Sequence, residues 1–118
     1  MADDTFYVYV ESVRSLVDNS TEQVRRNATN TVNAYYDGSI IVVTVEIGEG
    51  MMHTARLNGA IMEQISEETA YHNITGMPIG FRRYWQGYLD SGGHFQFQAV
   101  SRDPPHNSRS VSLIIRRK

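Results

Sequence analysis

The sequence predicts an α+β domain, built as a twisted antiparallel sheet of five to seven strands with one or two helices on one face. Short runs rich in aromatic and β-branched residues recur along the chain and favour strands. Two other stretches carry apolar residues at helical spacing. A β-sandwich, in which the helical stretches are partly loop, is the alternative.

Six segments have the composition and alternation of strands. They are Thr5–Val13, Thr31–Tyr36, Ser39–Ile47, Phe81–Leu89, His94–Val100 and Val111–Ile115. The third is apolar on both faces, which favours a central strand covered on both sides. Asp37-Gly38 between the second and third predicts a tight hairpin turn. The last three segments read as an antiparallel meander, with Asp90–Gly93 as its first turn.

Two segments are predicted to be helical. The first begins at Ser20, because Gln23 follows at capping-box spacing. The second begins near Asn58, because four residues recur every fourth position: Leu57, Ile61, Ile65 and Thr69. Met51–Leu57, just before it, is ambiguous between a strand and irregular structure.

Composition sets the class of protein. With 118 residues and 41% apolar residues, the chain fits one globular domain over residues 1–118. It has no cysteine, which excludes a disulfide framework, a thiolate metal site and a cysteine nucleophile. We see no signal peptide and no apolar run long enough to span a bilayer, so the expectation is a soluble cytoplasmic protein.

Charge is distributed unevenly along the chain. Residues 1–76 carry 11 acids and 4 bases (net −7), whereas residues 77–118 carry 2 acids and 7 bases (net +5), which together give the net charge of −2. Complementary acidic and basic surfaces would favour head-to-tail self-association. The basic end Arg116–Lys118 belongs to this pattern.

No catalytic residue, metal ligand or cofactor is predicted. The four histidines lack His-x-His, His-x-x-x-His and Glu-x-x-His spacing. Gly48-Glu49-Gly50 lacks the remaining residues of a phosphate-binding loop. Glu46, at the end of a strand, is expected to face solvent rather than to have a raised pKa. The protein is therefore expected to bind rather than to catalyse.

A candidate binding face lies on the late strands. Alternation turns Phe95 and Phe97 inward and their neighbours on that strand outward. If the preceding strand lies alongside, its tyrosines and Gln86 join them in an aromatic, amide and arginine surface typical of recognition. The predicted binding residues are Arg82, Tyr84, Trp85, Gln86, Tyr88, His94, Gln96 and Gln98.

The predicted function is a non-catalytic binding or assembly module that associates with itself or with a protein partner through this face. One alternative is a glycan-binding, lectin-like protein; another is a small-molecule enzyme with a cone-shaped α+β pocket. Nucleic acid ranks last because the net charge is −2.

A short segment bears on the glycan alternative. Gly87–Phe97, with its glycine turn followed by a strand, resembles a stretch near the end of actinoporin-like sandwiches and fungal fruit-body lectins. It covers about a tenth of the chain, and the upstream half does not follow the pattern of those families. The resemblance implies no more than that glycan binding stays among the alternatives.

Overall fold

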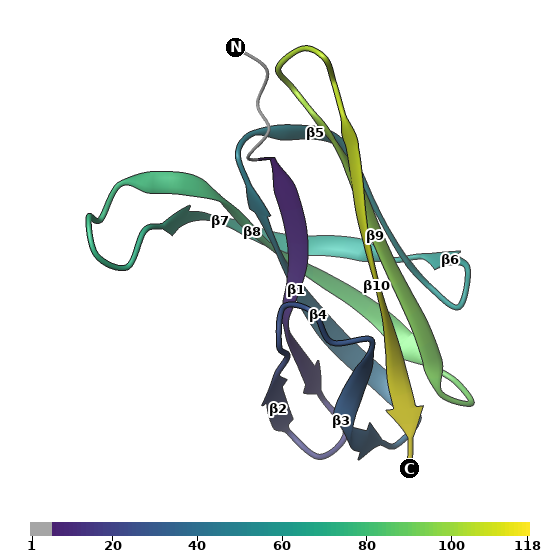
Figure 1. Ribbon diagram of the computed structural model, residues 1–118. Coiled ribbons are helices and arrows are strands. Elements are labelled where there is room, and N and C mark those ends of the chain that lie inside the picture. Colours follow the sequence, from purple (N-terminus) through teal and green to yellow (C-terminus); the bar gives the residue numbers. More distant parts are fainter. Residues whose placement is uncertain (1–5) are drawn as a thin grey trace.

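The computed structural model describes residues 6–118, and this part of the chain is a β-sandwich without helices (Figure 1). Its ten strands are β1 (Tyr7–Ser15), β2 (Ser20–Gln23), β3 (Asn30–Tyr35), β4 (Gly38–Ile47), β5 (Gly50–Leu57), β6 (Ala60–Ile61), β7 (Glu63–Tyr71), β8 (Pro78–Leu89), β9 (Gly93–Ser101) and β10 (Ser108–Arg117). Sheet A has the order β2-β1-β4-β8-β7, and sheet B has the order β3-β10-β9-β5-β6. All pairs are antiparallel except β3–β10, which is parallel.

The α+β prediction is wrong, and the β-sandwich alternative fits. The first predicted helix is the edge strand β2, which pairs with β1 through Val13 and Glu22. The buried carboxylate of Glu22 explains the extended conformation, because it accepts hydrogen bonds from the N–H groups of Val32 and Asn33 and from the hydroxyl of Tyr35. A helix would not hold Glu22 against β3 in this way.

The second predicted helix is replaced by a hairpin and a strand. Asn58 and Gly59 both have positive φ, 52° and 81°, as a two-residue primed turn between β5 and β6 requires. The every-fourth-residue pattern forms no common face, because Leu57 is buried while Ile61 is 71% exposed and Ile65 lies at a bulge in β7. The Asn-Gly pair was therefore the stronger signal.

Both predicted turns connect the two sheets instead of closing hairpins. Asp37-Gly38 lies between β3 of sheet B and β4 of sheet A, and Asp90–Gly93 lies between β8 of sheet A and β9 of sheet B. Of the predicted meander, only β9 and β10 pair with each other. The physical reason is burial: the inner faces of β4 and β8 in sheet A can be covered by β9 of sheet B only if the chain changes sheet at these corners.

Other predictions are confirmed. β4 is the central strand of sheet A, and strands are present near all six predicted segments, although Thr5 lies outside the described residues. Phe95 and Phe97 are fully buried, whereas Gln96 and Gln98 are exposed. Between the sheets lies one core that draws residues from both. Residues 6–118 contain no helix long and apolar enough to cross a membrane.

β8 lies very close to its neighbour β4 at Gly80. A Cβ atom on Gly80 would lie 1.8 Å from the carbonyl oxygen of Glu46, so no side chain fits without moving the backbone. Gly87, on the same strand, differs because its Cβ would meet side chains instead of backbone: the flexible end of Met62 at 2.8 Å and Leu57 at 3.3 Å.

We predict that Gly80→Ala lowers the free energy of unfolding by about 3 kcal/mol or more, because the two strands must separate. Gly87→Ala is the matched control and should cost less than about 1.5 kcal/mol, because Met62 can change rotamer. Urea unfolding of both variants measures the difference. Equal losses would contradict the close approach of β4 and β8.

Candidate binding groove and buried charge network

The charged groups and Tyr84 on the outer face of sheet A are paired within residues 6–118, whereas Gln86 and Tyr88 are not. Arg82 donates to Glu11 over 2.9 Å and to Glu68 over 3.2 Å, and the hydroxyl of Tyr84 donates to Glu68 over 2.6 Å. The hydrogen bonds from Tyr84 and Arg82 lower the pKa of Glu68, and the bond to Glu68 in turn raises the pKa of Tyr84. These groups are already satisfied by one another.

The outer face of sheet B is hollowed into a shallow groove of about 220 Å³, here called the sheet B groove. Its lining residues come from β5, β9 and β10: Thr54, Arg56, Gln96, Phe97, Gln98, Ser110, Val111 and Ser112. Two cross-strand rows carry its outward polar side chains, with Thr54, Gln98 and Ser110 in one row and Arg56, Gln96 and Ser112 in the next. None of the lining residues is acidic.

The polar side chains of the sheet B groove are largely unused. Arg56 donates to the carbonyl of Gly59 over 3.3 Å, and Gln98 donates to Ser108 over 2.9 Å. The side chains of the other four polar residues make no hydrogen bond within residues 6–118: Thr54, Gln96, Ser110 and Ser112. This surface combines a hollow with donors and acceptors that are free for a ligand, without the ion pairs that occupy much of the outer face of sheet A.

The structure divides the predicted binding residues among three places. Trp85 is 4% exposed and lies in the core, where its Nε1 donates to the hydroxyl of Thr44 over 2.9 Å. β8 and β9 belong to different sheets, so the single face expected from the sequence does not form. Arg82, Tyr84, Gln86 and Tyr88 lie on the outer face of sheet A, and His94, Gln96 and Gln98 lie on that of sheet B.

Sequence reasoning missed the other polar residues of the groove. Thr54 and Arg56 lie in the segment that was ambiguous, and Ser110 and Ser112 alternate with inward residues of β10. The alternation of Ala55 and Leu57 with Thr54 and Arg56 was the available signal for an outward polar face. It does not reveal which strands lie next to one another.

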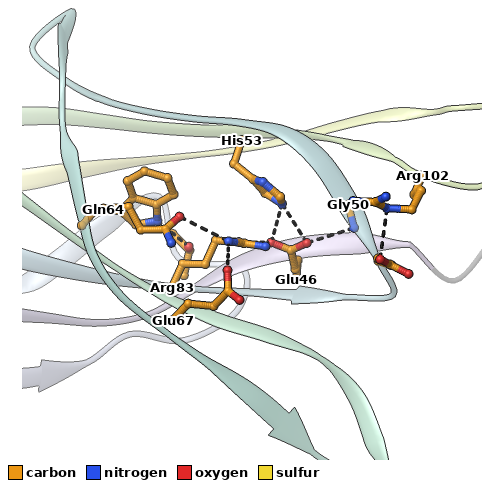
Figure 2. A network of polar contacts seen from close by, with 10 residues as sticks. Glu46, Gly50, His53, Gln64, Glu67, Arg83 and Arg102 are labelled. Atoms are coloured by element: carbon orange, nitrogen blue, oxygen red, sulfur yellow. Dashed lines mark hydrogen bonds and ion pairs between the residues drawn. The ribbon is translucent and has the colours of Figure 1, made fainter.

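A buried charge network joins the sheets at the end of β4. The carboxylate of Glu46 is fully buried and accepts hydrogen bonds from Nε of Arg83 over 2.6 Å, from Nε2 of His53 over 2.9 Å and from the N–H of Gly50 over 3.0 Å (Figure 2). Arg83 also reaches Gln64, over 3.2 Å, and Glu67, both on β7. The prediction that Glu46 faces solvent is therefore wrong. We call these side chains the Glu46 network.

Electrostatics keep Glu46 ionised. Burial alone would raise the pKa of its carboxyl, but the hydrogen bonds from His53 and Arg83 outweigh burial and hold the pKa below its ordinary value. Because a carboxylate only accepts hydrogen bonds, Nε2 of His53 carries a proton toward it. The arrangement joins β4, β7 and β8 of sheet A to β5 of sheet B, and it encloses the acid instead of presenting it to a substrate.

The uneven charge along the chain is used within the molecule. Each arginine that forms an ion pair comes from residues 77–118, and each acid comes from residues 1–76. The pairs are Arg82 with Glu11 and Glu68, Arg83 with Glu46 and Glu67, Arg102 with Glu49, and Arg117 with Asp37. Self-association stays a prediction, but the charge complementarity that suggested it operates inside the fold.

The pKa of Glu46 yields a prediction about acid stability. Because its pKa is lower in the folded state, Glu46 stabilises the fold above its ordinary pKa of 4.5 and loses this contribution as the pH falls through the folded-state value. Glu46→Gln should lower the free energy of unfolding by about 3–5 kcal/mol at neutral pH, because it leaves Arg83 buried without its main partner.

Urea unfolding at neutral and acidic pH measures this effect, and the gap between wild type and Glu46→Gln should narrow in acid. Glu49→Gln is the control, since Glu49 and Arg102 form an exposed pair worth less than about 1 kcal/mol. A variant as stable as wild type at neutral pH would mean that the Glu46 network does not hold the sheets together.

The comparisons with known proteins identify a family but no activity. No curated protein and no solved structure gave a significant match to the chain. A family model described as a domain of unknown function, DUF4879, matches residues 2–115. The chain therefore belongs to the DUF4879 family.

Proposed function

We propose that the protein is a non-catalytic binding module that holds a neutral glycan in the sheet B groove. The observation that carries this proposal is a hollowed sheet face without a carboxylate, on which the side chains of Thr54, Gln96, Ser110 and Ser112 are unpaired and Arg56 and Gln98 each make one hydrogen bond. Such groups are satisfied by water in the free protein and are available to a polar ligand.

The donor and acceptor types match sugar hydroxyls. A sugar hydroxyl both donates and accepts, and so do the amides of Gln96 and Gln98 and the hydroxyls of the groove. Arg56 adds paired donors, which suit two neighbouring hydroxyl oxygens. Gln96 and Gln98 lie on the same face two residues apart, roughly 7 Å along β9, so they would contact different parts of an extended ligand.

The size of the groove favours a chain lying along it over an enclosed small molecule. Its volume of about 220 Å³ is smaller than typical small-molecule pockets, which begin at about 300 Å³. An open groove contacts one side of its ligand and leaves both ends free. A polysaccharide or a branched glycan satisfies this geometry.

Charge argues for a neutral ligand. Arg56 is the one charged residue that lines the groove, whereas polyanions are bound by many basic contacts. The enzyme alternative required a cone-shaped α+β pocket, which the helix-free sandwich of residues 6–118 does not supply. Because neutral hydrogen bonds made in water contribute only about 1 kcal/mol each, we expect weak single-site binding that is strengthened by multivalent display.

We predict that Gln96→Ala weakens glycan binding about threefold to tenfold and that Arg56→Ala weakens it about tenfold or more, since bonds from a charged donor are stronger. A glycan array with the protein displayed multivalently identifies the ligand, and calorimetric titration then measures the variants. Gln86→Ala, which removes a glutamine from the outer face of sheet A, is the matched control and should bind like wild type.

Two results would refute this proposal. One is an array on which no neutral glycan is retained. The other is a loss of binding in Gln86→Ala as large as that in Gln96→Ala, because that would place the ligand elsewhere.

A further inference from the structure

The hairpin of β7 and β8 extends beyond the body of the sandwich. The pairing of β8 with β4 ends at Gly80, opposite Ile47, whereas β7 and β8 continue to pair as far as Tyr71 and Pro78. In Figure 1 this green hairpin projects to the left, away from the other strands. Tyr71 and Pro78 form the last pair of the hairpin, and residues 72–77 make the turn beyond it.

The tip of this hairpin carries exposed apolar side chains among uncharged polar ones and has no Asp, Glu, Lys or Arg. Ile74 is 85% exposed, Met77 63% and Tyr71 61%. No Asp, Glu, Lys or Arg occurs between Glu68 and Arg82, in a chain of which 20% is charged. Apolar side chains gathered at a projecting tip mark a contact site, because single scattered ones would need no explanation. We call residues 71–78 the hairpin tip.

Most backbone N–H groups of the hairpin tip are paired within the turn. Ile74 and Thr75 donate their N–H groups to Nδ1 of His72, and Gly76 donates to the carbonyl of His72. Met77 donates to the hydroxyl of Thr75, and Pro78 has no N–H to satisfy. Unpaired backbone groups oppose the entry of a loop into an apolar medium, and these bonds lower the number of unpaired N–H groups, while the carbonyls of the turn can stay hydrated at the level of the lipid headgroups.

We propose that the hairpin tip inserts into the interface between the headgroups and acyl chains of a lipid bilayer. Interfacial segments bury their apolar side chains about 5–10 Å deep, at the boundary between headgroups and acyl chains. Ile74 and Met77 would enter the acyl region, and Tyr71 would lie at headgroup level, where tyrosines are enriched.

A protein partner fits this feature less well. Stable protein interfaces bury more than about 1,000 Å², and a tip of eight residues offers less than that. Strand addition along β7 is also disfavoured, because this edge carries Glu63, Glu67 and Glu68 and is interrupted by bulges. A bilayer needs neither a large matching surface nor a free edge.

Electrostatics predict a preference for neutral lipid. The charges at the base of the hairpin are paired with one another, Arg82 with Glu68 and Arg83 with Glu67. No unpaired basic cluster lies there to attract anionic headgroups. The insertion is therefore apolar in origin and independent of the groove on sheet B.

Vesicle flotation tests the proposal directly. Wild-type protein should float with pure phosphatidylcholine vesicles. Its partition coefficient should change by less than about twofold when phosphatidylserine is added, and salt should not release the protein. Ile74→Ser should lower the partition coefficient about tenfold or more, because an almost fully exposed isoleucine loses its transfer into lipid. Ile61→Ser removes another highly exposed isoleucine, from β6, and is the matched control, expected to float like wild type.

A reporter at the tip locates the contact. Tyr71→Trp should show a blue-shifted emission with vesicles and quenching by brominated lipid, whereas the buried Trp85 of the wild type should show neither. Wild type that does not float would overturn the proposal. So would equal losses in Ile74→Ser and Ile61→Ser, or an Ile74-dependent dimer in light scattering without vesicle binding. None of these results depends on the glycan proposal, since the groove residues are unchanged.

Discussion

The buried carboxylate of Glu46 is the constraint on which both proposed surfaces depend. Moving a carboxylate out of water costs several kcal/mol, and the cost is offset only if strong donors surround it. Those donors are Arg83 of β8 and, from β5, His53 and the N–H of Gly50, so one acid on β4 holds two other strands in place. The same requirement limits how the chain can pass from β4 to β5.

This constraint reaches the sheet B groove through β5. Gly50 lies against Glu46 so closely that a Cβ atom would meet its carboxylate oxygen at 2.8 Å, and Met52 adopts a positive φ of 55° before the register resumes at Thr54. His53 turns inward and stacks on Phe97 of β9 with ring centres 6.3 Å apart. The inward position of His53 fixes Thr54 on the outer face, and with it the outward row of β5.

The same network reaches the hairpin of β7 and β8. Arg83 lies on β8 and contacts Gln64 and Glu67 of β7, so the edge strand is held by charge as well as by its backbone pairing. On the opposite face of sheet A, Arg82 holds Glu68 and Glu11. Adjacent arginines thus secure both faces of the hairpin base, and the uncharged tip extends from a rigid support.

Local patterns in the sequence predicted what each strand does with its side chains but not which strands are neighbours. The burial of Phe95 and Phe97 follows from alternation within one strand, and the central place of β4 follows from apolar residues on both its faces. The corner at Asp37-Gly38 could not be told from a hairpin, because both use the same turn residues. The sequence also contains the turn-forming pair Asn58-Gly59. The helix prediction followed instead from the apolar residues at every fourth position, a spacing that proved accidental.

The candidate site was harder to predict for the same reason. Glu46 lies in an apolar strand with no local sign that an arginine and a histidine, 37 and 7 residues away, will meet it. The groove needed the pairing of β9 with both β5 and β10, which no local pattern encodes. The two outer faces have similar polar composition in the sequence. They differ in how their polar side chains are paired. On sheet A, acids accept hydrogen bonds from arginine and tyrosine. On sheet B, no acid lines the groove, so its amides are open to a ligand.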